Sequence, residues 1–248
     1  MPRQAPAAPR ALHDLHEQDA VDSVLADGGR WRLQAPAGAD ELQLLATDRG
    51  QVLKRWPLPG GGELLASATR RSVVVAPAAL PELWEISLDP HAEPQYEGLV
   101  HDFRMGEGLP VPGFLHLRRT RLPHPLAHIT LDAAGLLLVG AAPGQPVLGY
   151  NLDARRRAAA WAVGGDPRPR AGTWCQRHGR AGLAVPDAAR PLLHWLDADG
   201  QALQSLAVPA PLRWVRARPD GRLLAATAGA LLQIDLEHGT VAAQHESS

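Results

Sequence analysis

Three short stretches of this sequence carry side chains that could do chemistry. His101 and Asp102 are adjacent in LVHDFRMGE, and His124 and His128 are four residues apart in LPHPLAHIT. Two arginines flank a proline in DPRPRAG, at positions 168 and 170. An imidazole beside a carboxylate is typical of a proton shuttle or a ligand, and paired guanidinium groups bind carboxylates in two-pronged fashion. Each pattern also has a purely structural interpretation.

The adjacent pair His101 and Asp102 lies in a long polar run punctuated by glycine and proline. Neighbouring residues of an extended segment point to opposite sides, so the two side chains need not touch. One interpretation is therefore a loop held by turns and by Phe103 packing over a sheet. The other is a ligand-covering loop, because segments of this length without a role are uncommon.

The spacing of His124 and His128 would suit two metal ligands on one face of a helix. Pro123 and Pro125, however, exclude a regular helix through this segment. On a strand the two imidazoles would be separated by roughly 13 Å along the chain, too far apart to share one metal ion. We expect at most one of them to line a central channel.

The Arg168-Pro169-Arg170 turn could hold the carboxylates of a ligand, or it could be a solvated loop. No glycine-rich phosphate loop, paired CxxC, CxxCH or GxSxG motif occurs in the chain. Cys175, the single cysteine, excludes an intrachain disulfide and is more typical of a small core residue than of a nucleophile. The sequence therefore predicts no catalytic residue and no metal site.

Bulk composition narrows the class of protein. A formal net charge of −1 and a pI of about 6.8 argue against a general nucleic-acid binder, which needs clustered positive charge. No run of 18 apolar residues predicts a membrane span. The N-terminal residues lack the apolar core of a signal peptide, so composition alone does not indicate a compartment.

The elements that must position these side chains come from an internal repeat. Glycines at turns recur at positions 135, 179 and 221, a spacing of about forty residues. Each unit reads as four short apolar strands joined by Gly or Asp turns. The predicted units are residues 21–58, 59–91, 122–163, 170–208 and 211–246, with an N-terminal tail at 1–20 and an inserted loop at 92–121 within a single domain of residues 21–248.

Small antiparallel sheets of this kind cannot bury both faces alone, so neighbouring units must stack on them. Radial stacking of four-stranded sheets is a β-propeller, and a period near forty residues is usual for it. We therefore predict an all-β chain of about five propeller blades. The sequence leaves open whether five units close into a ring or form an open arc that pairs with another chain.

The segment LPELWEISLDPHAEPQYEGLVHDFRMGEGLPVPGFLHLRRT resembles the haem d1 domain of cytochrome cd1 nitrite reductase and related d1-domain proteins. The resemblance extends over roughly residues 60–190. It implies an eight-bladed, periplasmic propeller that holds a haem d1 tetrapyrrole over its central channel. In the reductases of this family, one histidine binds the haem iron and two others, on the opposite side, handle nitrite and its protons.

The chain departs from that pattern at the expected ligands. The two distal histidines correspond to PLPGGGELL, which offers Glu63 and no imidazole, and to RLPHPLAHI, which offers His124 and His128. The basic loop of the family corresponds to DPRPRAGTW, and no counterpart of the proximal ligand is found. The resemblance therefore implies an accessory protein that binds or handles haem d1 or a related tetrapyrrole in nitrite reduction and denitrification, and not a nitrite reductase itself. The residues expected to bind the cofactor are His101, His124, His128, Arg168 and Arg170.

The alternative function is a ligand-free propeller that serves as a scaffold for protein–protein interaction or self-association. Loss of the expected histidines and of blades favours this alternative, whereas the concentrated resemblance around residues 80–120 favours the tetrapyrrole.

Overall fold

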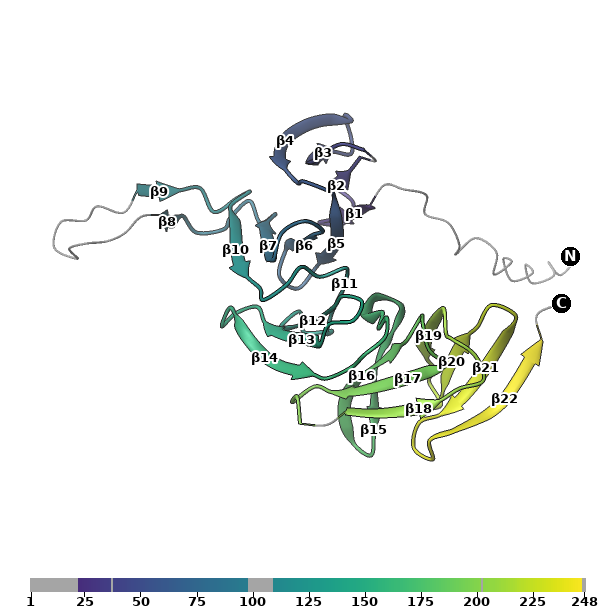
Figure 1. The fold of residues 1–248 in the computed structure, drawn as a ribbon. Coiled ribbons are helices and arrows are strands. Elements are labelled where there is room, and N and C mark those ends of the chain that lie inside the picture. The colour runs from purple at the N-terminus through teal and green to yellow at the C-terminus, as the bar shows by residue number, and fades with distance from the viewer. Residues whose placement is uncertain (1–21, 37, 98–108, 202, 247–248) are drawn as a thin grey trace, which may run out of the picture.

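The computed structural model describes residues 22–36, 38–97, 109–201 and 203–246. The predicted N-terminal tail at 1–20 lies outside the described residues. The described chain is almost entirely β-structure, with one short 3-10 helix, η2 (Pro169–Ala171). The strands form five four-stranded antiparallel sheets, which we call blades 1 to 5 in chain order, and one two-stranded hairpin (Figure 1).

Every blade but the second takes its four strands in sequence order. Blade 1 contains β1 (Asp22–Ala26), β2 (Trp31–Ala35), β3 (Glu41–Ala46) and β4 (Gln51–Pro57). Blade 2 contains β5 (Gly62–Ser67), β6 (Ser72–Pro77), β7 (Glu82–Ser87) and β10 (Leu117–Arg121). Blade 3 contains β11 (His128–Leu131), β12 (Leu137–Ala141), β13 (Val147–Asn151) and β14 (Arg156–Trp161). Blade 4 contains β15 (Thr173–Arg177), β16 (Arg180–Pro186), β17 (Leu192–Asp197) and β18 (Leu203–Ala207). Blade 5 contains β19 (Trp214–Ala217), β20 (Leu223–Ala226), β21 (Ala230–Asp235) and β22 (Thr240–Glu246).

The turns that the repeat predicted are present. Gly135, Gly179 and Gly221 have φ angles of 72°, 73° and 81°, in the left-handed region that a residue with a Cβ avoids. Each lies between the first and second strands of its blade. The prediction of four-stranded antiparallel units is therefore confirmed for five sheets, although the described residues do not reach the eight blades that the resemblance implies.

The insertion lies inside blade 2, which corrects the predicted boundary at residue 91. The fourth strand of this blade, β10, pairs with β7 and occupies part of the segment predicted as an inserted loop at 92–121. Its sequence, LRRTR, carries almost no apolar signal because this outer strand faces solvent. Between β7 and β10, the strands β8 (Gln95–Glu97) and β9 (Leu109–Val111) form a hairpin that projects away from the blades (Figure 1).

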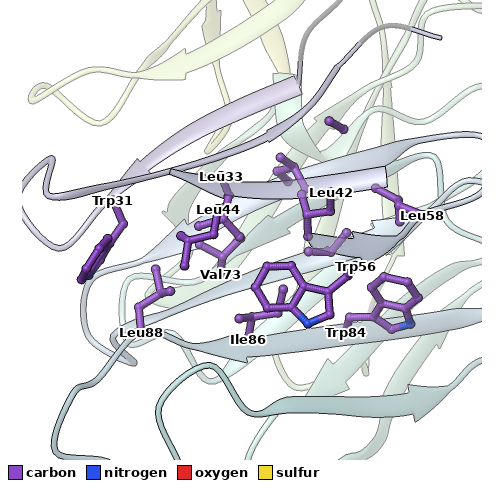
Figure 2. Packing of buried hydrophobic residues seen from close by; sticks show 13 residues of the cluster. Trp31, Leu33, Leu42, Leu44, Trp56, Leu58, Val73, Trp84, Ile86 and Leu88 are labelled. Carbon is purple, nitrogen blue, oxygen red and sulfur yellow. The ribbon is translucent and has the colours of Figure 1, made fainter. Parts of the chain in front are cut away.

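The hydrophobic core lies between successive blades. Four clusters of buried residues join blades 1 and 2, 2 and 3, 3 and 4, and 4 and 5. Figure 2 shows the first of them, where Leu33, Leu42 and Leu44 of blade 1 pack with Trp56 against Trp84 of blade 2. Among the described residues, no cluster joins blade 5 to blade 1. Of the two arrangements left open above, the structure therefore has the open arc (Figure 1).

Blade 1 covers its outer side with polar side chains. Because Leu33 and Leu42 face blade 2, the residues that alternate with them face away from it. On that side Gln34 donates to Gln43 at 3.2 Å, and Arg55 donates to Glu41 at 2.5 Å. A polar outer face is what a terminal repeat needs to remain in contact with water.

Replacing Trp84 with alanine is expected to cost about 3–5 kcal/mol of unfolding free energy, because it leaves a cavity at the interface of blades 1 and 2. The indole is only 1% exposed. Urea unfolding followed by far-UV circular dichroism measures the change. Trp214→Ala serves as the control, since this indole is half-buried and lies in none of the four clusters. Equal losses in both variants would contradict this account of the core.

Candidate functional site

Three blades bring polar side chains together where their inner strands begin. Glu63 is the second residue of β5, His128 is the first of β11, and Arg170 lies in η2, just before β15. The Glu63 Oε1 atom lies 3.3 Å from Nη1 of Arg170 and 3.5 Å from Nδ1 of His128. We call these three residues the Glu63 cluster. It joins two residues predicted from the resemblance with one that was noted only for lacking an imidazole.

The backbone around Glu63 holds the carboxylate in place. A Cβ at the preceding Gly62 would collide with the Ala76 carbonyl across the β5–β6 pair, so the close approach requires glycine. The Ile129 amide donates to Glu63 Oε2, which ties β5 to β11. Glu63 is 10% exposed, whereas the Arg170 side chain is 40% exposed. The cluster thus has a shielded anion and a solvent-facing cation.

The arrangement directs the His128 ring. A carboxylate at Nδ1 favours the tautomer with a proton on that nitrogen, and this makes Nε2 the basic lone-pair nitrogen. A histidine held in this way can accept a proton or bind a metal in a ligand. The cluster therefore offers one oriented imidazole and one guanidinium on the same face.

The other predicted residues have different places. The Nδ1 atom of His124 lies 2.9 Å from the Pro125 carbonyl oxygen, and its Nε2 is buried without a partner, so this imidazole does not join the cluster. Arg168 donates to Asp166 at 2.7 Å. His101 lies outside the described residues.

A shallow hollow of about 650 Å³ lies on the same face, between blades 4 and 5. It is lined by Arg168, Ala188, Ala210, Pro211, Leu212, Arg213 and Ala228. These residues belong to loops at the end of each sheet where the inner strands begin, as the Glu63 cluster does. The structure gives the Arg213 guanidinium no acceptor among the described residues. Sequence reasoning missed both Glu63 and Arg213, because neither lies in a recognisable motif.

A second polar cluster, around Asp187, is structural. Asp187 is fully buried and accepts hydrogen bonds from the amides of Asp166, Ala189 and Arg190. Burial alone would raise the pKa of this carboxyl, but the Arg190 side chain at 2.7 Å and the amides outweigh that effect, so the pKa is lowered. Its acceptors are thus engaged in fixing the turn before β17.

His194 belongs to this structural cluster. Its Nδ1 lies 2.8 Å from Ser205 Oγ and its Nε2 lies 3.4 Å from Asp187 Oδ2. Desolvation lowers its pKa despite the nearby carboxylate, so the imidazole is neutral when folded. Burial likewise raises the pKa of Cys175 to about 11, which makes the thiolate scarce at neutral pH and fits a core residue.

Two searches of the described residues give negative results. No group of three or more His, Cys, Asp or Glu side chains is placed to hold a metal ion among them. Within the same residues, no helix has the length and apolar character needed to cross a membrane.

Comparison with solved structures supports the d1-type propeller fold. The dihydro-heme d1 dehydrogenase NirN, solved in complex with DHE, superposes with a TM-score of 0.74 at 19% identity, covering 91% of this chain and 47% of that chain. A chain of the mitotic checkpoint complex gives a TM-score of 0.62 at 9% identity, covering 91% of this chain and 64% of that one. The chain thus spans about half the length of the NirN chain. No protein-family model and no curated protein sequence matches it.

The lowered pKa of His194 predicts an acid-sensitive stability. Below the unfolded-state value of about 6.5, the unfolded chain binds a proton that the folded chain excludes, so stability present above pH 6.5 falls as the pH drops toward the folded-state pKa. Urea unfolding between pH 7.5 and 5 measures this slope. The slope is expected to shrink in His194→Gln and to persist in His91→Gln, an exposed control. An unchanged slope in His194→Gln would count against the assignment.

Proposed function

We propose that this propeller is an accessory protein that binds or handles haem d1 or a related tetrapyrrole, in support of nitrite reduction, without reducing nitrite itself. The observation that carries the proposal is the Glu63 cluster. Two inner-strand positions that the family resemblance assigns to ligand-handling residues lie side by side in it, on a fold shared with a haem d1 enzyme.

The residues on this face fit such a ligand chemically. A tetrapyrrole presents a flat apolar ring and peripheral carboxylates. The hollow between blades 4 and 5 has apolar walls of alanine, proline and leucine for the ring. Arg213, which has no protein acceptor among the described residues, and the partly exposed Arg168 and Arg170 supply cations for the carboxylates.

His128 is the residue best placed to bind a metal carried by the tetrapyrrole, since its Nε2 is the nitrogen turned from Glu63. When bound, the iron of a haem would supply redox and ligand-binding chemistry. The protein's own contribution is then to orient His128 through Glu63 and to neutralise carboxylates through the arginines.

The substitution of a carboxylate for an imidazole argues against nitrite reduction by this chain. Glu63 stands at one of the two positions where the resemblance expects a proton-donating histidine. Its carboxylate already accepts hydrogen bonds from the Ile129 amide and from Arg170, and so remains an anion that positions neighbours. Binding and delivery of a tetrapyrrole need only the oriented imidazole and the cations.

A ligand-free interaction scaffold is the second candidate function. The side of blade 5 that faces away from blade 4 carries the half-buried Leu224 and Leu231, which alternate with core residues of β20 and β21. This side has no partner blade among the described residues, in contrast to the polar outer side of blade 1.

Titration with haem d1, followed by visible absorption, tests the two candidates. Wild-type protein is expected to shift the absorption bands with saturable, micromolar binding. His128→Ala is expected to lose the band shift and to weaken binding by about tenfold or more, since an imidazole–metal bond is removed. His91→Ala, an exposed histidine in the insertion, is the matched control.

Arg213→Gln should weaken the same binding severalfold with unchanged band positions, because it removes a carboxylate contact and no metal ligand. Arg222→Gln, an exposed arginine in the β19–β20 turn, should leave the affinity unchanged. Absence of any spectral shift with the wild-type protein would overturn the tetrapyrrole proposal and favour the scaffold.

A further inference from the structure

A second hollow, of about 450 Å³, lies at the opposite end of blades 2 and 3. It is formed by the turn after β5, the turn after β13, and the two legs of the insertion. Glu63 is at the start of β5, whereas Thr69 and Arg70 in this hollow follow its end. A strand of this length spans about 20 Å, so the hollow is separate from the Glu63 cluster. We call it the lower pocket.

A chain of four alternating charges crosses the lower pocket. Asp153 of blade 3 accepts from Arg70 at 2.6 Å, and Arg70 donates through Nε to Glu85 Oε1 at 2.7 Å. Glu85 Oε2 then accepts from Arg118 of β10 at 2.5 Å. Ser72 also donates to Glu85, at 3.0 Å.

The inner part of this chain carries an excess positive charge. Burial would raise the pKa of Glu85, but Arg70 and Arg118 outweigh it, so the pKa is lowered and the carboxylate stays ionised. Arg70 and Glu85 are 11% and 13% exposed, whereas Asp153 is 62% exposed and is screened by water. Two guanidinium groups thus share one shielded carboxylate, which leaves about one unit of uncompensated positive charge.

Arg70 and Arg118 have different roles in the lower pocket. Arg70 joins blade 2 to blade 3 through Glu85 and Asp153, and this accounts structurally for its charge. Arg118 is the cross-strand neighbour of Glu85 and donates only one terminal nitrogen to it. Its Nε and Nη1 have no acceptor among the described residues, and the side chain is 33% exposed at the pocket. These free donors have the forked geometry that binds a carboxylate.

The walls of the lower pocket are polar and fixed. Ser87 and Gln95 add a hydroxyl and an amide to the lining. The two legs of the insertion approach so closely that a Cβ at Gly113 would collide with the Glu93 carbonyl. The amide of Leu115 donates to the Ser87 carbonyl at 2.9 Å, which anchors one leg to β7. A ligand would therefore meet preformed donors.

We propose that the lower pocket binds a small hydroxylated monocarboxylate, of the sugar-acid class, with its carboxylate on Arg118 and its hydroxyls on Ser87 and Gln95. A monoanion matches the single excess charge, whereas a dianion such as phosphate would exceed it. The ligand would bridge blade 2 and the insertion. This site is independent of the tetrapyrrole proposed for the opposite face.

Isothermal titration calorimetry with D-gluconate tests the proposal, with neutral D-glucose and inorganic phosphate as comparison ligands. The full chain is expected to bind gluconate saturably in the millimolar range or tighter, and glucose at least tenfold more weakly. Arg118→Gln should weaken gluconate binding at least tenfold, and Gln95→Ala severalfold. Arg121→Gln, an exposed arginine on the same strand, is the matched control and should bind as the wild type does.

Circular dichroism confirms that each variant is folded, and the substitution at Gln95 avoids the charge network altogether. His128→Ala should bind gluconate normally, so failure of the tetrapyrrole proposal leaves this result readable. No saturable gluconate binding by the wild type would overturn the proposal. So would tighter binding of phosphate than of gluconate, or equal losses in Arg118→Gln and Arg121→Gln.

Discussion

The burial of apolar sheet faces between neighbouring blades is the interaction on which the rest of this structure depends. A four-stranded sheet has two apolar sides and cannot shield either alone, so each blade is held by the next. This packing fixes where every inner strand begins. Glu63, His128 and Arg170, from three different blades, meet for that reason and not because of any local motif.

The two carboxylate-centred clusters differ in how much of their bonding capacity the protein itself uses. Asp187 is fully buried, and amides, Arg190 and His194 surround it, so its ionisation stabilises a turn. Glu63 instead directs an imidazole and a partly exposed guanidinium toward a face with an apolar hollow nearby. Burial and exposure, more than residue type, thus separate structural polar groups from those available to a ligand.

The antiparallel blades also separate two kinds of chemistry in space. Loops at one end of the sheets carry the Glu63 cluster and an apolar hollow with arginines, which suits a large anionic ring. Turns at the other end, with the insertion, form a small polar pocket around a shielded ion network. A protein of this design can hold a tetrapyrrole on one face while its other face and the open side of blade 5 remain available for other contacts.

The sequence alone determined the repeat, because a four-strand unit needs turn glycines and apolar strands at a regular spacing, and both are local properties. It also indicated His128 and Arg170 through the resemblance. The strand β10 escaped notice because an exposed outer strand such as LRRTR has no apolar signal. Glu63, Arg213 and the pairing of Arg118 with Glu85 were decided only by the tertiary structure, since their partners or surroundings come from segments distant in the chain. The open arc is likewise tertiary, because whether the last blade meets the first depends on packing angles that no single repeat encodes.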